Sequence, residues 1–264
     1  MRVFVLGSGS LGNSTLIEAG GTRVLVDAGY GPRASARRLE SLGTDLVSRG
    51  LDGIVITHQH GDHIGHLESL ARAFRCPVFL HPGIEAKRVR ARFEVRPYDP
   101  GTRFHVGAVA IDAVHVPHDA PQVALRLTAS GPGGASFGIA TDVGAPTREL
   151  VRLFSGCDAA LLEANHCREL LELGPYPPRL KKRVSGGLGH LNNHETAEVA
   201  AKLVGSRMKR LFLGHMSRTN NTPERALDAV RPRARGMDVS VLGHCVPASF
   251  RIQARGQMEL PFSA

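Results

Sequence analysis

The sequence predicts an α/β protein in which two β-sheets pack against each other and carry helices on their outer faces. Two observations favour this class. Short apolar strands separated by Gly-rich turns fill the first quarter of the chain, and a second strand-rich region occupies its middle. Helical patterns lie between and after these strands, as in layered α/β proteins. The 264 residues can enclose one sizeable core, so we expect a single domain over residues 1–264.

Apolar runs bounded by turn residues predict the strands of the first half of the chain. They lie at Arg2–Leu6, Thr15–Glu18, Arg23–Val26, Gly53–Thr57 and Val78–Leu80. Apolar residues at helical spacing predict the helices between these strands. They lie at Ala34–Leu42, Leu67–Phe74 and Gly83–Arg92.

The second half of the chain continues the alternation. Its predicted strands are Val109–Val116, Gln122–Thr128, Ala135–Ala140, Ala159–Glu163 and Arg210–Leu213, with a final strand or two after Val239. Its predicted helices are Thr147–Phe154, Glu195–Val204 and Pro223–Arg231, the last opened by Pro at its first turn. A hairpin turn is expected at Ser130–Gly134, and a loop rich in Pro, Gly and cations at Gly174–Gly189.

The composition is that of an ordinary soluble protein, with 42% hydrophobic and 22% charged residues. No apolar run is long enough to span a bilayer, and the N-terminal residues lack the long apolar region and cleavage site of a signal peptide. We therefore expect a cytoplasmic protein without a membrane partner. The net charge of +9 favours a polyanionic partner, either nucleic acid or a phosphorylated small molecule. The four cysteines form no C-x-x-C pair, which disfavours a thiolate zinc site.

The segment Thr57–His63 carries the strongest motif, because three histidines and one aspartate follow an apolar strand there. His58 and His60 are two residues apart, so in an extended segment their side chains point the same way. Asp62 and His63 then turn toward a second point. Imidazole and carboxylate groups together suit zinc, manganese or iron. The segment therefore predicts a metal site, against the alternative of a polar loop that happens to be rich in histidine.

Further ligands are expected elsewhere. Two metal ions, each with one open coordination position, need about three ligands beyond those in this segment. Active-site residues of open sheets often collect at the carboxyl ends of strands. Three candidate ligands follow predicted strands, namely His118, Asp142 and His215. Residues at the end of another predicted strand are expected to line the site without binding metal, namely Glu163, Asn165 and His166.

At these residues the sequence resembles the metallo-β-lactamase superfamily, and within it the YycJ/WalJ group of bacterial exonuclease-like proteins. The resemblance runs nearly end to end and keeps the order of the superfamily's motifs. The matching positions are His58-x-His60-x-Asp62-His63, Gly7–Ser14, Pro117–Ala120, Asp142, Gly189–Leu191 and His215–Asn221. Two departures are visible: Asn192 stands where Ser is expected, and Met216 stands where Leu is expected. Neither departure touches a proposed ligand.

The resemblance implies an αββα sandwich, the metallo-β-lactamase fold, holding two divalent metal ions. Zinc or manganese is expected, with iron as a further candidate. The first metal would be held by His58, His60 and His118. The second metal would be held by Asp62, His63 and His215, and Asp142 would bridge both. We prefer His118 to the neighbouring His115 because His118 lies in the matching Pro-His-Asp-Ala segment.

The expected chemistry is hydrolysis by a hydroxide that bridges two metals, since the metals lower the pKa of its parent water toward neutrality. Asp62 is placed among the catalytic residues as well as among the ligands. His190 is the candidate for a proton donor to the leaving group or for a phosphate contact, because a Gly-rich stretch before it can carry it to the site. The alternative for His190 is a surface loop histidine.

Polar and basic residues near these motifs are candidate substrate contacts. The opening Gly-Ser loop offers backbone amides and hydroxyls to phosphate oxygens, with a plain turn as the alternative. A basic cluster precedes His190 and would contact a phosphate backbone, unless it is solvated surface. The candidate contacts are Ser8, Ser10, Asn13, Lys181, Lys182, Arg183, Ser217 and Asn220.

The predicted function is that of a metal-dependent phosphodiesterase acting on nucleic acid, DNA in preference to RNA. The resemblance specifies a 5′→3′ DNA exonuclease. A phosphodiesterase for small cyclic substrates, or another metallo-hydrolase, stays open because the same metal core would serve. A di-iron redox protein is the alternative from another class, but relatives of that kind place Glu where this chain has Gln59. The native metal, the polarity of cleavage and the oligomeric state are left open by the sequence.

Overall fold

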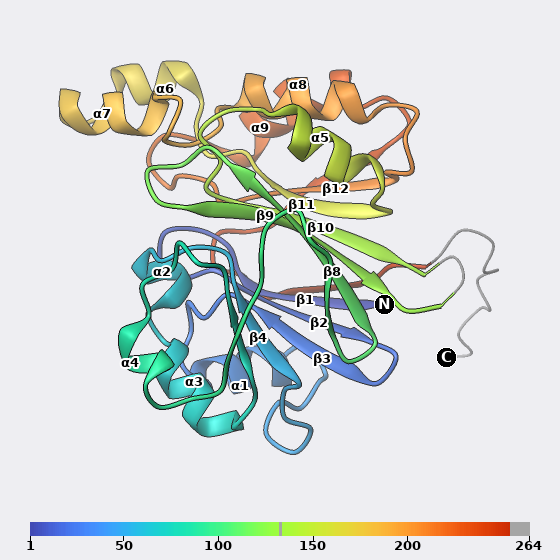
Figure 1. Cartoon of the computed structure of the whole chain (residues 1–264). Helices are drawn as coiled ribbons and strands as arrows, with labels where there is room; N and C mark the ends of the chain where they lie inside the picture. Colours follow the sequence, from blue (N-terminus) through green and yellow to red (C-terminus); the bar gives the residue numbers. More distant parts are fainter. Residues whose placement is uncertain (132–133, 254–264) are drawn as a thin grey trace.

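Two β-sheets form the centre of the protein (Figure 1), whose computed structural model describes residues 1–131 and 134–253. The first sheet contains β1 (Arg2–Gly7), β2 (Ser14–Ala19), β3 (Thr22–Val26), β4 (Gly53–Ile56), β5 (Val78–Leu80), β6 (Val95–Pro97) and β14 (Ala248–Arg251). The second contains β7 (Phe104–Val106), β8 (Val109–Val116), β9 (Gln122–Ala129), β10 (Ser136–Ala140), β11 (Ala159–Glu163), β12 (Arg210–Gly214) and β13 (Asp238–Val241). The described strands run in the order β14-β1-β2-β3-β4-β5-β6 and β13-β12-β11-β10-β9-β8-β7.

Helices lie on the outer sides of both sheets (Figure 1). On the side of the first sheet lie α1 (Pro32–Glu40), α2 (Gly61–Ile64), α3 (Leu67–Phe74) and α4 (Lys87–Arg90). On the side of the second lie α5 (Arg148–Ser155), α6 (Arg168–Leu173), α7 (Pro178–Ser185), α8 (Asn193–Leu203), α9 (Pro223–Val230) and the 3₁₀ helix η1 (Arg231–Arg233). The succession of helices, sheet, sheet and helices confirms the predicted αββα sandwich. No helix in the described part of the chain is long and apolar enough to cross a bilayer.

Three apolar layers hold the sandwich together. The alternation of side chains along each strand explains why one strand contributes to two of these layers. Successive side chains of a strand point to opposite faces. In β1, Val3 and Val5 therefore belong to the core between the two sheets, which also contains Phe137 of β10. Phe4 and Leu6 of the same strand belong to the core beneath α1 and α3. A third core lies between the second sheet and α5, α8 and α9.

Parallel strands of both sheets end at one edge of the sandwich, and this edge positions the site. β3 pairs in parallel with β4 in the first sheet, and β10, β11 and β12 pair in parallel in the second. The segments that follow these strands meet across the sandwich, since His63 Nε2, after β4, lies 2.9 Å from Asp142 Oδ2, after β10. Loops at the carboxyl ends of strands therefore face a common space, as in other α/β active sites.

Two predicted segments differ from the structure. The helix expected at Gly83–Arg92 is confined to α4, because the chain makes tight turns before it: Ile84 N donates to the carbonyl of His81, and Ala86 N to that of Ile84. The loop expected at Gly174–Gly189 contains α7, so that prediction was wrong. Pro178 opens this helix, and a proline is compatible with the first helical turn because no backbone N–H is needed there.

The two edge strands β6 and β7 escaped prediction. Each has three residues, as does β5, but β5 is apolar and fully buried, whereas β6 and β7 contain polar, exposed residues, so no apolar run marks them. The hairpin turn expected at Ser130–Gly134 includes positions 132 and 133, which lie outside the described residues. The strands on its two sides, β9 and β10, pair antiparallel.

The start of α8 gives a prediction about stability. Asn192 Oδ1 accepts hydrogen bonds from the backbone N–H groups of His194 (3.0 Å) and Glu195 (3.1 Å), and Glu195 Oε2 accepts from Asn192 N (2.9 Å). This is a complete capping box. Asn192→Ala should lower the free energy of unfolding by about 1 kcal/mol, measured by urea denaturation. Asn192→Ser should change it much less because Ser also caps; equal losses in both variants would contradict the capping role.

Candidate metal centre

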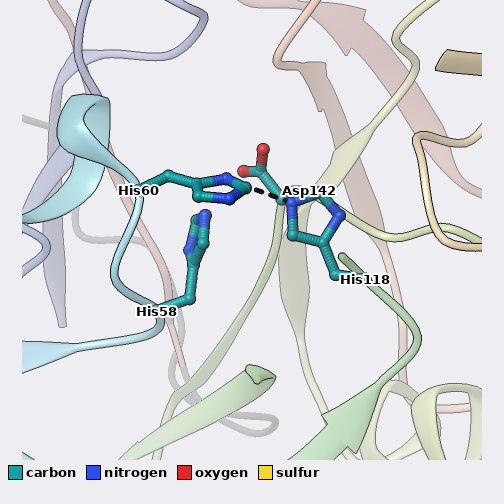
Figure 2. A group of neighbouring side chains, drawn as sticks. All are labelled: His58, His60, His118 and Asp142. Atoms are coloured by element: carbon teal, nitrogen blue, oxygen red, sulfur yellow. Dashed lines mark hydrogen bonds between the residues drawn. The ribbon is translucent and has the colours of Figure 1, made fainter. Parts of the chain in front are cut away.

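The histidine-rich segment starts directly after β4 and ends in α2. His58 and His63 are buried, and His60 is half-buried. Figure 2 shows His58 and His60 pointing toward His118, which follows β8, and toward Asp142, which follows β10. One ligand atom from each of these four side chains lies within 4.8 Å of the others. They form the first group of candidate ligands.

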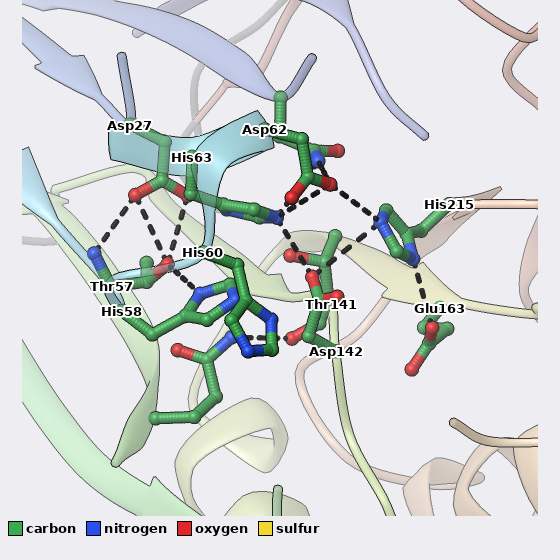
Figure 3. A network of polar contacts seen from close by, with 12 residues as sticks. Asp27, Thr57, His58, His60, Asp62, His63, Thr141, Asp142, Glu163 and His215 are labelled. Atoms are coloured by element: carbon green, nitrogen blue, oxygen red, sulfur yellow. Dashed lines mark hydrogen bonds and ion pairs between the residues drawn. The ribbon is translucent and has the colours of Figure 1, made fainter. Parts of the chain in front are cut away.

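A second group lies beside the first and consists of Asp62, His63 and His215 (Figure 3), with ligand atoms again within 4.8 Å of one another. Asp142 is common to both groups, since it belongs to the first and its Oδ2 also lies 2.9 Å from His63 Nε2 and 3.5 Å from His215 Nε2 of the second. His190 forms a further set with Asp142 and His215. The fold therefore brings all the predicted ligands and His190 together.

His115, the competitor of His118, is placed elsewhere. It lies within β8, and its ring neighbours that of His81 at 6.2 Å. Among the described residues it belongs to none of the clustered ligand groups. His118 is fixed in its place by a hydrogen bond between its Nδ1 and the carbonyl of Gly189, at 3.0 Å. This contact directs His118 Nε2 toward the cluster.

The donor set fits metal ions. His58 Nε2 is buried and forms no hydrogen bond with any described residue. A buried polar atom without a partner costs about 1–3 kcal/mol, so this nitrogen is suited to bind a ligand that supplies the missing partner. Imidazole nitrogens and carboxylate oxygens at one point are the donors that zinc and manganese accept. Both groups can therefore hold a cation.

Asp27 contacts the ring nitrogen of His63 that points away from the cluster. This residue was not identified from the sequence. Its Oδ2 lies 2.7 Å from His63 Nδ1, and its Oδ1 accepts hydrogen bonds from Thr57 N (2.8 Å) and Thr57 Oγ1 (3.0 Å), as Figure 3 shows. This contact turns His63 Nε2 toward Asp142. Such partners fix the ring orientation of metal-binding histidines. The available signal was a carboxylate placed directly after a buried strand, β3.

Glu163, the last residue of β11, connects two histidines of the site. Its side chain is fully buried, and its Oε1 lies 2.7 Å from His190 Nδ1 and 2.9 Å from His215 Nδ1. Its Oε2 accepts a hydrogen bond from Val143 N at 2.7 Å. One carboxylate therefore sets the orientation of both rings, as expected for a residue that lines the site without binding metal. Asn165 also serves a supporting role, donating from Nδ2 to the carbonyl of His215 at 2.9 Å.

Backbone strain marks the same strand ends. Asp27, Asp142 and His215 have φ values of 62°, 57° and 51°, in the left-handed region that side chains other than glycine rarely adopt. Each follows a strand directly or within two residues. Such conformations cost of order 1–3 kcal/mol and cluster at functional sites. The surrounding hydrogen bonds hold these residues there, which turns their side chains into the shared space.

The electrostatics of the cluster favour a bound cation. Burial lowers the pKa of His58 and of His118, so both rings are neutral and keep a lone pair for a metal. Burial opposes the charge of His63, but Asp142 and Asp27 outweigh it and raise its pKa to about 10. The pKa of Asp142 lies well below its ordinary value despite burial, because His215 and His63 stabilise the carboxylate. The carboxylates of the cluster therefore attract positive charge. A divalent ion can supply this charge in place of the histidine protons.

A cleft of about 470 Å³ opens over the cluster. Three of the predicted substrate contacts line it, namely Ser10, Arg183 and Ser217. Arg183 lies in α7 and pairs with Asp119, since its Nε donates to Asp119 Oδ2 at 2.8 Å. Asp119 Oδ1 in turn lies 3.2 Å from His60 Nε2. An arginine of α7 is thus linked to the first ligand group.

The remaining predicted contacts lie elsewhere. Ser8 and Asn220 are buried: Ser8 Oγ accepts a hydrogen bond from His215 N at 2.9 Å, and Asn220 N donates to Ser217 Oγ at 3.1 Å. Asn13 is also buried, and its Nδ2 lies 3.1 Å from Asp62 Oδ2 and 2.8 Å from His63 Nε2. Ser8 and Asn13 therefore contact candidate ligands, whereas Asn220 contacts Ser217. Lys181 and Lys182 line a separate cavity on another side of α7.

The Gly-rich stretch before His190 is held in place. Gly189 N donates to the carbonyl of Gly186 at 2.8 Å, and His190 N to that of Val184 at 2.9 Å. At Gly144, a Cβ would come within 2.4 Å of the carbonyl oxygen of Gly187, so the two segments pack closely. His190 therefore reaches the cleft through a fixed turn.

Comparison with known proteins agrees with this geometry. The family model described as a β-lactamase superfamily domain matches residues 22–216. The chain belongs to this superfamily. It is 32% identical over 231 residues to exodeoxyribonuclease WalJ of Streptococcus pneumoniae, covering 84% of each chain. It is 29% identical over 228 residues to exodeoxyribonuclease YycJ of Bacillus anthracis, again covering 84% of each. The predicted resemblance to the YycJ/WalJ group is thereby confirmed.

Solved structures confirm the fold of this superfamily member. The metallo-β-lactamase fold protein YhfI of Bacillus subtilis superposes with a TM-score of 0.69 at 16% identity, covering 95% of this chain and 99% of that one. Zn²⁺-bound PqqB of Methylobacterium extorquens gives a TM-score of 0.69 at 15% identity, covering 94% and 99%. At such identities these likenesses speak for the sandwich architecture alone.

Proposed function

We propose that this superfamily member is a two-metal-dependent phosphodiesterase that degrades DNA from the 5′ end. The observation that carries the proposal is the pair of adjoining ligand groups with Asp142 common to both, at the bottom of a cleft that Arg183 also lines. The names of the exodeoxyribonuclease relatives support DNA as the substrate. The net charge of +9 agrees with a polyanionic partner.

In this proposal, His58, His60 and His118 would hold one divalent ion, and Asp62, His63 and His215 would hold the other, with Asp142 available to both. Zinc or manganese suits the donors, and iron is a further candidate. When bound, two such ions would supply Lewis acidity and lower the pKa of a water molecule between them. Asp62 stays ionised in spite of its burial, because His215 and His63 lower its pKa. It can therefore act both as a ligand and as a hydrogen-bond acceptor for the attacking water.

His190 is proposed to donate the proton that the leaving oxygen needs. Its Nδ1 faces Glu163, so the opposite nitrogen, Nε2, is available at the cleft that His190 lines. Burial lowers the pKa of His190, but the charge of Glu163 and the hydrogen bond to it outweigh burial and raise it above the ordinary value. A protonated imidazole is thereby kept beside the leaving group. General acids of this kind contribute about 10²–10⁴-fold to rate.

The experiment that tests the function uses protein stripped of metal and reloaded with Mn²⁺ or Zn²⁺. Single-stranded and duplex DNA and RNA are labelled at either the 5′ or the 3′ end. Digestion from the 5′ end releases the 5′ label at once as a mononucleotide, while the 3′ label passes through a ladder of shortening products. Intact polymers under both metals would refute the nuclease.

A phosphodiesterase for small cyclic substrates is the second candidate, and the size of the cleft favours it. About 470 Å³ is the volume of an ordinary small-molecule site. Cleavage of a cyclic nucleotide with DNA left intact would support this candidate. A di-iron protein would need an additional carboxylate at position 59, where this chain has Gln59. The Oε1 of Gln59 accepts a hydrogen bond from Glu85 N at 3.2 Å.

Glu163 gives a pH prediction. The charge of Glu163 raises the pKa of His190, so the acid form of His190 is present below that pKa and lost as the pH rises through it. Glu163→Gln removes the charge, and the alkaline limb of the kcat profile should therefore shift to lower pH. Activity at neutral pH should fall about 10–100-fold. The profile is measured on DNA at saturating metal, with the exposed Glu198→Gln as the control; an unmoved limb would contradict the coupling.

A further inference from the structure

A second cavity of about 420 Å³ adjoins α7. It is lined by His166, Arg168, Lys181, Lys182, Ser185 and Asn192, among others. The helix α7 separates it from the metal cleft, because Leu180, Arg183 and Val184 of the same helix line that cleft. We call this space the His166 cavity.

His166 is the unusual residue of this cavity. Its side chain is fully buried, and neither ring nitrogen has a hydrogen-bond partner among the described residues. Leaving a buried polar atom unpaired costs about 1–3 kcal/mol, and native proteins rarely tolerate it without a reason. His166 is among the residues that line the cavity, and its ring nitrogens are covered by neighbouring atoms. A small shift of the lining would let the ring donate a hydrogen bond to a ligand in the cavity.

The surroundings of His166 select an anion. Arg168, Lys181 and Lys182 supply three positive charges to the lining. Asn192 is the N-cap of α8, an eleven-residue helix whose N-terminus carries a partial positive charge. Two glutamates, Glu172 and Glu195, also line the cavity, so its three cations exceed its acids by one. Arg168 Nη2 lies 3.8 Å from Glu195 Oε1, and Lys181 Nζ donates to the backbone carbonyl of Glu172. A phosphate group would find cationic, hydroxyl and imidazole donors together here.

The position of the cavity fits a strand that leaves the metal cleft. A helix with its side chains is about 10–12 Å across, and successive nucleotides of one stacked strand advance about 3.4 Å. A strand crossing α7 therefore reaches the cavity within about three nucleotides of the scissile bond. Arg183 on the cleft side and Lys182 on the cavity side would both face its backbone.

We propose that the His166 cavity is an anion subsite that binds a phosphate group of the substrate strand about three nucleotides from the bond that is cleaved. The proposal rests on the proposed nuclease function. The phosphate is either an internal diester or the terminal phosphate of a short strand. In both cases His166, Lys181 and Lys182 would make the contacts.

The test compares the double variant Lys181→Ala/Lys182→Ala with the control Lys202→Ala/Lys209→Ala, which removes the same charge from exposed lysines of α8 and of the segment before β12. Values of kcat/KM are measured for a DNA dinucleotide, a hexanucleotide and bis(p-nitrophenyl) phosphate. The wild type and the control should prefer the hexanucleotide over the dinucleotide by about tenfold, and the first double variant should lose this preference. For this variant, the plot of log(kcat/KM) against log salt concentration should also have a shallower slope. The change should match the loss of about one to two phosphate contacts.

A second variant, His166→Leu, separates binding from folding. Replacing an unpaired buried imidazole with an apolar side chain should leave the Tm equal or higher, while the length preference is lost. In the metal-loaded protein, inorganic phosphate should also shift the ring-proton NMR signals of His166, which this variant identifies. The two sources of phosphate are distinguished by comparing dinucleotides and hexanucleotides that carry a 5′ phosphate or a 5′ hydroxyl.

The outcomes separate the two proposals. If the wild type cleaves neither DNA nor the small diester, the proposed function fails. If it cleaves DNA with the same length preference in all variants, the nuclease stands and the subsite is refuted. Loss of the preference in His166→Leu and in the Lys181/Lys182 variant, but not in the control, supports the subsite.

Discussion

Asp142→Asn is expected to lower nuclease activity by about 10³-fold or more and to reduce the bound metal. The carboxylate belongs to the first ligand group and lies 2.9 Å from His63 Nε2 and 3.5 Å from His215 Nε2 of the second. An amide of the same shape would remove the negative charge that the proposed cations share, and metals at such sites contribute several kcal/mol to the transition state. At 25 °C each 1.36 kcal/mol changes a rate about tenfold. Metal content is measured by elemental analysis beside the exonuclease assay.

The matched control for Asp142→Asn is Asp158→Asn, which changes another buried aspartate, directly before β11. Asp158 Oδ2 accepts a hydrogen bond from Ser136 N at 2.8 Å and pairs with Arg207, away from the cluster. This variant should lose stability but retain its metal and its rate at a temperature where it stays folded. If Asp142→Asn kept full metal content and activity, the shared-ligand assignment would be wrong.

His190→Gln is expected to lower kcat on DNA by about 10²–10⁴-fold, because Gln cannot donate a proton to the leaving oxygen. The loss should be much smaller on bis(p-nitrophenyl) phosphate, whose leaving group departs without protonation. This contrast distinguishes a proton donor from a residue that merely holds phosphate, since the latter would affect both substrates. Steady-state kinetics on both substrates at saturating metal give the result.

The control for His190 is His194→Gln, which changes an exposed histidine near the start of α8. It should leave both rates unchanged. An equal loss on DNA and on the small diester in His190→Gln would assign His190 to phosphate binding, and no loss on either would remove it from the mechanism.

Most elements were predictable because their signals are local. Strand periodicity located β1, β4 and β11 to within a residue or two, and the helix signals located α3 at Leu67–Phe74 as observed. α7 escaped because its Pro- and cation-rich composition resembles a loop, while its helical state depends on packing through one buried residue, Val184. The edge strands β6 and β7 exist only because a neighbouring strand offers hydrogen bonds.

What the sequence by itself determined is the ligand chemistry: the spacing of His58, His60, Asp62 and His63 after a strand, and further His and Asp residues at later strand ends. Only the tertiary structure decided how these are supported and what lies beside them. Asp27 and Glu163 contact their histidines from positions remote in sequence. The cations of α7 lie on different sides of the helix: Arg183 lines the cleft, and Lys181 and Lys182 line the His166 cavity. The physical reason is that ligand identity is a property of a residue, whereas orientation, burial and partnership arise from contacts between distant strands and helices.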